Sequence, residues 1–165
     1  MKHSPTYFFL IAFTIVLIAC KVKAASNRNW VYDYESVLDS SQRERLANLY
    51  IGHERKTTNE IVLITTPTYE NDTSILFYSV NKFRQLGIGK KNINNGVLIV
   101  YSGANRQVRI TNGYGTERFL TDEISARIID SLMIPHFKKG EVFEGLWNGS
   151  NAIVNFLERP ENKIK

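Results

Sequence analysis

The stretch from Gly87 to Asp122, GIGKKNINNGVLIVYSGANRQVRITNGYGTERFLTD, contains the pattern that decides the fold. It opens with a glycine-rich, basic turn. A continuous apolar and largely β-branched run at 97–101 then predicts a buried strand. Alternating apolar and polar residues at 108–111 predict a half-buried strand. The small polar residues at 102–106 predict a turn, so the two strands are close enough to pair as a hairpin.

A second glycine-rich loop, Asn-Gly-Tyr-Gly at 112–115, follows this hairpin. Thr121 or Asp122 can then cap a helix. Because a hairpin returns the chain to the edge from which it started, the two glycine-rich loops are predicted to lie at the same end of the sheet.

Outside this stretch, the sequence predicts four helices and one more strand. The apolar run at 61–64 is typical of a strand covered on both faces. Helical stripes of apolar residues occur at 46–53, 76–87, 124–132 and 143–157. Together these elements predict an α/β fold, a three-layer α/β/α sandwich with a central mixed β-sheet.

Several boundaries follow from local signals. The first helix has two candidate capping boxes, Asp39 with Gln42 and Ser41 with Glu44, and the sequence does not decide between them. The third helix is predicted to end before Pro135. Residues 31–38 form a short lead-in segment, the domain is predicted to span 30–159, and residues 160–165 are a charged tail.

The amino-terminal segment is typical of a bacterial export signal. Residues 1–19 combine a charged start with a short apolar run, which predicts a signal peptide. Leu17-Ile18-Ala19-Cys20 resembles a lipobox, and Cys20 is the only cysteine. The alternative is an ordinary signal peptide cut near residues 23–25. We expect lipid attachment at Cys20, a tether over 20–29, and an exported protein anchored to a membrane of the cell envelope.

Composition excludes some partners. The formal net charge is +5 and hydrophobic residues make up 43% of the chain, as in an ordinary globular domain. The basic residues are dispersed and no aromatic-rich nucleic-acid motif occurs, so no nucleic-acid partner is expected.

Common catalytic motifs are incomplete. Gly89-Lys90-Lys91 lacks the first glycine and the hydroxyl residue of a phosphate-binding loop. Gly113-Tyr114-Gly115 lacks the third glycine of a dinucleotide fingerprint. The histidines have no paired spacing for zinc, and no serine or cysteine nucleophile lies in a recognisable motif.

The ordered motifs of this chain resemble those of the TPM domain family, also called the TPM phosphatase family. Its pattern W-G-I-G-x-K-x-x-D-N-G-V-L-L matches residues 86–99 here, D-R-x-V-R-I matches 105–110, and G-Y-G-x-E-x-x-L-T-D matches 113–122. The resemblance reaches back to Val31-Tyr32-Asp33 and forward to Gly145. It implies the layered α/β/α architecture.

The resemblance also implies a candidate metal site. Acidic residues at such positions gather in a groove in this family, where they are proposed to hold a divalent cation. Oxygen ligands suit Ca²⁺ or Mg²⁺, and a cation so held could activate water for phosphate hydrolysis. The implied ligands are Asp33, Asn94, Asn95, Glu117 and Asp122, with Gly113, Tyr114 and Gly115 supplying loop backbone.

This chain departs from the family pattern at Leu86, Asn94 and Asn105. Asn94 replaces an aspartate that the family often carries, which removes one negative charge from the implied site. Each implied ligand also has a structural alternative. Asp122 can stabilise a helix start, Asp33 can cap a turn, and the glycines can serve positive φ.

Two functions therefore follow from the resemblance. One is a metal-assisted, phosphatase-like hydrolase. The other is a non-catalytic, membrane-tethered interaction module that helps to assemble or maintain a membrane protein complex. The lost charge at Asn94 favours the second, whereas Asp33, Glu117 and Asp122 favour the first.

Overall fold

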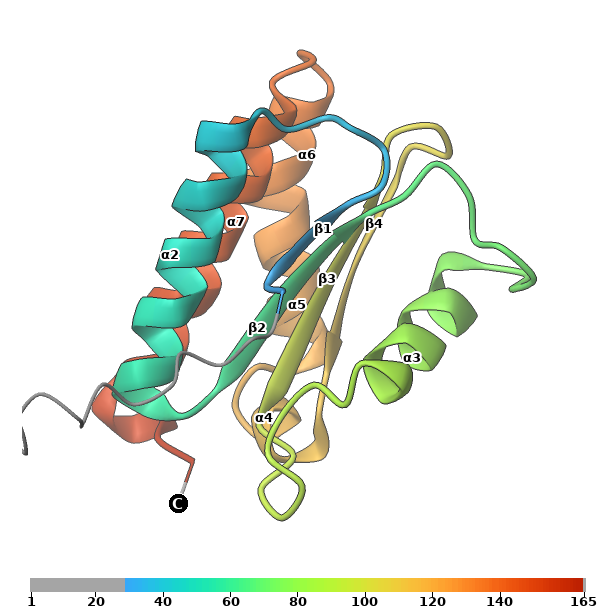
Figure 1. The fold of residues 1–165 in the computed structure, drawn as a ribbon. Helices are drawn as coiled ribbons and strands as arrows, with labels where there is room; N and C mark the ends of the chain where they lie inside the picture. The colour runs from blue at the N-terminus through green and yellow to red at the C-terminus, as the bar shows by residue number, and fades with distance from the viewer. Residues whose placement is uncertain (1–28, 165) are drawn as a thin grey trace, which may run out of the picture.

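The computed structural model describes residues 29–164 and contains a four-stranded sheet (Figure 1). The strands, in spatial order, are β1 (Val31–Asp33), β2 (Glu60–Thr65), β3 (Gly96–Ser102) and β4 (Gln107–Asn112). The first three strands are parallel, and β4 pairs with β3 as an antiparallel hairpin. The predicted hairpin and the mixed sheet are therefore confirmed.

Helices cover both faces of this sheet, which confirms the predicted α/β/α layering (Figure 1). One face carries α2 and α7, and the other carries α3. The helical elements are α2 (Ser40–Thr57), α3 (Ile75–Gln85), α4 (Tyr114–Glu117), α5 (Asp122–Ile128), a π-helical turn (Ile129–Met133), α6 (Ile134–Phe137), α7 (Val142–Leu157) and a 3₁₀ turn (Pro160–Asn162).

The two parallel crossovers have opposite hands. Both step in the same direction across the sheet, from β1 to β2 and from β2 to β3, but α2 and α3 lie on opposite faces. One of the two must therefore depart from the usual right-handed rule. Because each face receives one crossover helix, the sheet is buried from both sides.

The structures of the edge strand β1 and of the start of α2 answer two questions that the sequence left open. The lead-in segment pairs in parallel with β2, Val31 opposite Leu63, and so forms a fourth strand that its length of three residues concealed. At α2, the capping box is the pair Asp39 and Gln42.

The predicted helix end before Pro135 is wrong. The chain passes through a π-helical turn at Ile129–Met133 and remains helical through Pro135 into α6. A proline lacks the amide hydrogen and crowds the preceding turn of an α-helix, and a π-turn provides a different hydrogen-bond spacing there.

The folded part of the chain also extends further towards the C-terminus than the predicted end at residue 159. Asn162 is buried, and its Nδ2 donates to the carbonyl oxygen of Phe156 at 2.8 Å. The predicted signal peptide and most of the tether, with Cys20, lie outside the described residues. Within residues 29–164, no helix is long and apolar enough to cross a membrane.

Candidate functional site at two ends of the sheet

The two glycine-rich loops meet at one end of the sheet, which we call the glycine-loop end (residues 86–95 and 113–122). The amide of Gly115 donates to the carbonyl oxygen of Asn94 at 3.1 Å, and that of Gly113 donates to Gly96 at 2.9 Å. The hydroxyl of Thr116 also donates to the Gly96 carbonyl, at 3.1 Å. These bonds confirm that the loops before and after the hairpin lie together.

Gly113 and Gly115 permit close approach of the two loops, and neither has a positive φ. Gly113 has a φ of −74°, which any residue adopts. A Cβ atom at Gly113 would lie 2.3 Å from the Asn94 carbonyl oxygen, and one at Gly115 would lie 2.0 Å from that of Ile93. Both distances are below van der Waals contact, so any side chain would push the two loops apart.

The two asparagines of the predicted metal site have structural roles in this arrangement. Asn94 has a φ of +53°, a conformation that Asn and Asp tolerate better than most residues. Asn95 is fully buried, and its Oδ1 accepts from the amide of Lys90 at 2.8 Å. Its Nδ2 donates to the carbonyl oxygen of Thr58 at 2.9 Å. Asn95 therefore links the loop to the end of α2.

The two carboxylates of the predicted metal site at this end, Glu117 and Asp122, are exposed. Glu117 ends the short α4, and Asp122 is the first residue of α5, directly after the Thr121 cap. A carboxylate in the first turn interacts favourably with the helix dipole, as the structural alternative for Asp122 proposed.

Two glutamates neutralise Lys90 in the basic turn. The sequence did not predict this cluster of charged side chains. The Lys90 Nζ atom lies 2.8 Å from Glu54 Oε1 and 2.7 Å from Glu60 Oε1. The other Glu60 oxygen accepts from the amide of Gly89 at 2.7 Å. Hydrogen bonds to Glu54 and then Glu60 raise the pKa of Lys90. Lys90 therefore fixes the loop to α2 and β2, and the only sequence signal was a glutamate at the start of an apolar strand.

Asp33 lies at the opposite end, which we call the strand-crest end (residues 33–39, 65–74 and 102–107). It ends β1, and its side chain is 2% exposed. Its carboxylate accepts from the amides of Val37 and Leu38, both at 3.1 Å, and from the hydroxyl of Thr65 at 2.5 Å. Arg43 Nη1 lies 3.4 Å away. Asp33 thus caps a turn.

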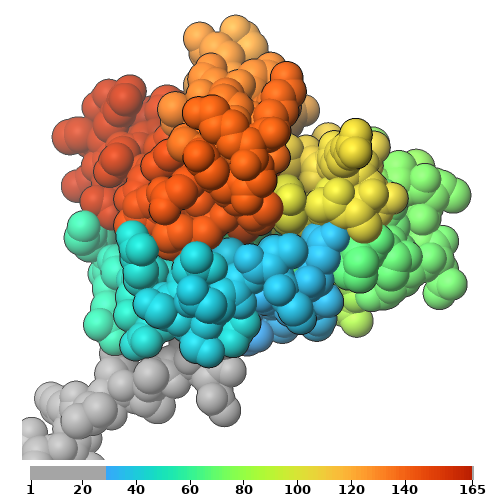
Figure 2. Space-filling view, turned by 90° about the horizontal axis from the view of Figure 1, so that it is seen from above, coloured from blue at the N-terminus to red at the C-terminus, as the bar shows by residue number. Residues whose placement is uncertain are grey.

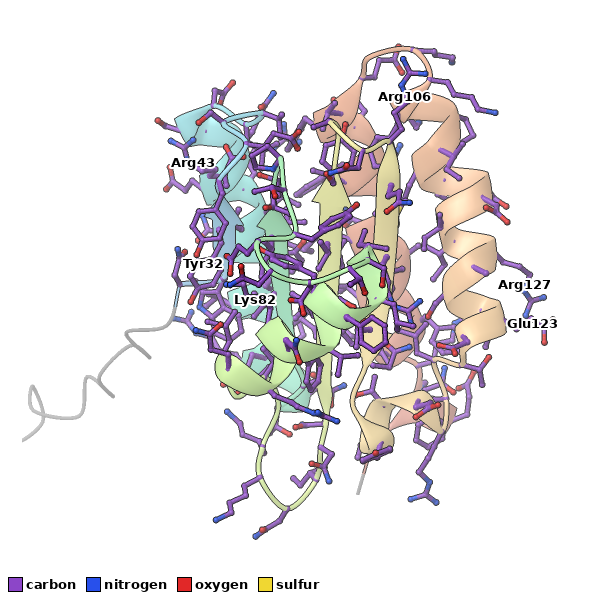
Figure 3. The ribbon with its side chains drawn as sticks, turned by 90° about the vertical axis from the view of Figure 1, so that its right-hand side faces the viewer. Tyr32, Arg43, Lys82, Arg106, Glu123 and Arg127 are labelled. Atoms are coloured by element: carbon purple, nitrogen blue, oxygen red, sulfur yellow. The ribbon has the colours of Figure 1, made fainter. Side chains whose placement is uncertain are left out.

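A second carboxylate holds the strand-crest end together. Glu35 accepts from the amides of Gly103 and Ala104, at 3.0 and 2.8 Å, in the turn between β3 and β4. Figure 2 looks onto this end, and Figure 3 labels Arg106 at the same hairpin turn. The sequence did not indicate this role of Glu35, because its partners are backbone amides 68 and 69 residues further along the chain.

The predicted five-residue metal site is therefore split, and its expected convergence is corrected. Asp33 is level with Thr65 and Tyr101, whereas Asn95 precedes β3 by one residue. Six residues of strand separate these levels, about 20 Å. Among residues 29–164, no three His, Cys, Asp or Glu side chains are grouped so that they could hold a metal ion. The predicted ligand set does not fit one cation.

Tyr114 is the remaining predicted residue, and it points away from the domain. It is 79% exposed, the largest value among the exposed large hydrophobic residues of the described chain. Because the glycines on either side are pressed against residues 93–94, its backbone is held firmly while its side chain is left in solvent.

Comparisons with known proteins agree with this architecture. The model of the TPM domain family matches residues 31–156. The solution structure of an N-terminal domain from P. gingivalis is similar, with 32% identity and a TM-score of 0.72, over 79% of this chain and 82% of that one.

Two more distant structures show the same fold. An N-terminal domain from Corynebacterium glutamicum has 10% identity and a TM-score of 0.64, over 81% of this chain and 83% of that one. A protein from the psychrophilic bacterium Bizionia argentinensis has 20% identity and a TM-score of 0.64, over 74% and 83%. No curated protein sequence matches this chain. The family model and the P. gingivalis structure establish that the chain belongs to the TPM domain family.

Proposed function

We propose that this protein is an exported, lipid-anchored TPM-domain protein of the bacterial cell envelope that acts as a non-catalytic interaction module in a membrane protein complex. The observation that supports this best is the state of Asp33. Its carboxylate is nearly inaccessible and bound to two amides, a hydroxyl and a guanidinium. Withdrawing it to bind a cation would leave those buried donors unpaired, which is costly.

The hydrolase alternative depends on Asn94, Glu117 and Asp122 without Asp33. Two carboxylates and one amide oxygen are a weak set for Ca²⁺ or Mg²⁺, which usually take six or more oxygen ligands. Asn94 has a left-handed conformation that Asn and Asp both tolerate, so the loop accommodates either residue, and the substitution removes a negative charge without a change of backbone.

The proposal is tested by extracting the full-length protein from membranes with a mild detergent and measuring its particle size. We expect the parent protein in the membrane fraction, in a particle larger than a detergent-bound monomer. Cys20→Ser should remove it from the membrane fraction or block its processing. A parent protein that is membrane-bound but monomeric would contradict the interaction module, and one with unchanged membrane retention after Cys20→Ser would contradict the anchor.

A further inference from the structure

We propose that the glycine-loop end of the domain rests on an anionic lipid bilayer, with Tyr114 at the boundary between the headgroups and the acyl chains. This inference rests on the proposed anchoring at Cys20, and it adds an orientation and a lipid-contacting surface to it. Three observations support it: where the chain enters the domain, where exposed charge remains unpaired, and how Tyr114 is presented.

The chain enters from the glycine-loop end. β1 runs parallel to β3, so Asn29, where the described chain begins, lies towards the side on which β3 begins and β4 ends. Eight residues lie between Cys20 and Asn29, and this segment can span at most about 30 Å. Asn29 is four residues before Asp33, so about 13 Å of chain separates it from the strand-crest end. The tether therefore reaches the bilayer by a shorter path when the glycine-loop end faces it.

Positive charge at this end is available to lipid. Lys56 and Lys90 are paired with glutamates, but four exposed basic residues form no ion pair within the described chain: Arg55, Arg84, Lys91 and Arg118. The exposed carboxylates there are Glu117, Asp122 and Glu123, and Glu123 lies 3.9 Å from Arg127, both labelled in Figure 3. The free charge at this end is therefore positive on balance.

The segment that leads to this end is positive as well. The excess of five basic over acidic residues in the whole chain is accounted for by Lys2, Lys21, Lys23, Arg28 and Lys165. Three of these lie between Cys20 and Asn29, and none of residues 1–28 is acidic. Basic residues beside a lipid anchor are attracted to anionic headgroups by about 1 kcal/mol each.

Tyr114 has the chemistry of an interfacial residue. A tyrosine has an apolar ring and a polar tip, and such residues are enriched where a membrane meets water. No hydrogen bond or ring contact involves its side chain within residues 29–164. The braced loop presents this side chain at little conformational cost on binding, because its backbone is already fixed.

The test uses the lipid-modified protein reconstituted into vesicles of phosphatidylglycerol and phosphatidylcholine with brominated chains. Bromine quenches only tryptophans near the acyl region, so Tyr114→Trp is compared with Tyr34→Trp at the strand-crest end, where Tyr34 is 57% exposed. After subtraction of the parent emission, we expect strong quenching of Tyr114→Trp and little of Tyr34→Trp. Lys91→Glu combined with Arg118→Glu, in a variant that melts like the parent, should reduce the Tyr114→Trp quenching towards the control.

Equal quenching of the two tryptophans, or stronger quenching of Tyr34→Trp, would overturn the orientation. Quenching that is unchanged by the two charge reversals and by phosphatidylcholine alone would overturn the anionic-lipid contact. Failure of the protein to sediment with vesicles would instead contradict the anchor of the proposed function. The two proposals therefore fail in distinguishable ways.

Discussion

The two ends of this sheet use the same residue types in opposite ways. At the strand-crest end, the carboxylates of Asp33 and Glu35 turn inward and bind backbone amides. At the glycine-loop end, the backbone forms the link, through Gly113 and Gly115, while Glu117, Asp122 and Tyr114 remain exposed. Side chains close the strand-crest end, whereas backbone contacts join the two glycine-rich loops, and Asn95 and the Glu60–Lys90 pair fix the first of these loops to the domain.

The largest effect should come from comparing one aspartate of each end. Asp33→Ala leaves two amides and the Thr65 hydroxyl without their acceptor, and we expect it to lower the free energy of unfolding by roughly 3 kcal/mol. The exposed Asp122→Ala should cost less than about 1 kcal/mol. Urea unfolding of both variants measures this contrast. Similar losses at the two positions would show that the ends do not differ as described.

A pair of glycines sharpens the contrast at the level of the backbone. Gly115→Ala places a Cβ 2.0 Å from the Ile93 carbonyl oxygen, so we expect a loss of about 2 kcal/mol from overpacking. Gly52 lies inside α2 with nothing within 4 Å of its missing Cβ. Gly52→Ala should therefore gain up to about 1 kcal/mol through helix propensity. Thermal melts should move in opposite directions, and a gain from Gly115→Ala would contradict the close packing of the loops.

A smaller, pH-dependent effect is expected where α2 and α7 meet near the glycine-loop end. Burial lowers the pKa of His53, although a hydrogen bond to Glu158 at 3.2 Å opposes this. Burial raises the pKa of Glu158, but hydrogen bonds from His53 and Lys56 outweigh it and leave the pKa lowered. Because the folded-state pKa values are lowered, the unfolded chain binds more protons, and stability falls as the pH drops below about 6.5, the unfolded value for histidine.

The measurement is the melting temperature of the parent and of His53→Gln between neutral and mildly acidic pH. The change of melting temperature with pH just below pH 6.5 should be smaller in His53→Gln than in the parent, even though that variant is less stable overall. His136→Gln is the matched control, since His136 pairs with the exposed Glu141. If the slope remains in His53→Gln and disappears in His136→Gln, the pH dependence comes from His136 and Glu141, and the prediction for His53 is wrong.

The smallest expected effect is that of divalent cations. Because Asp33 is separated from the exposed carboxylates, millimolar Ca²⁺ or Mg²⁺ should move the melting temperature of the parent very little. Asn94→Asp adds a negative charge to the loop that contacts Gly115, at the end that carries Glu117 and Asp122, and it is the variant in which a cation shift is most expected, through preferential binding to the folded state. A clear upward shift in the parent that Asp122→Ala removes would restore the metal-site reading.

The sequence predicted most of the fold because the decisive signals are local. The β-branched run at 97–101 and the alternation at 108–111 each specify their element within a few residues. The misses were features that depend on distant partners. The three residues of β1 form a strand only because β2 lies beside them, and Pro135 stays helical only through the π-turn before it.

The candidate site was predicted less well for the same reason. The proximity of the two glycine-rich loops followed from hairpin geometry. The position of Asp33 did not, because a parallel strand carries its carboxyl end to the far side of the sheet, and the chain gives no local sign that β1 is such a strand. The pairs of Glu60 with Lys90 and of Glu35 with Gly103 join segments that are far apart in sequence.

The central claim is that this TPM domain binds and does not catalyse, and phosphomonoester turnover tests it most directly. The parent, Asp122→Ala and Asp33→Asn are assayed with a generic phosphomonoester in the presence of Mg²⁺ or Ca²⁺, each after a melt that confirms folding. We predict that the parent hydrolyses the substrate no faster than the protein-free control does. Neither Asp122→Ala nor Asp33→Asn should change that rate. Metal-dependent turnover by the parent that is lost in a folded Asp122→Ala would contradict the interaction module and establish a hydrolase.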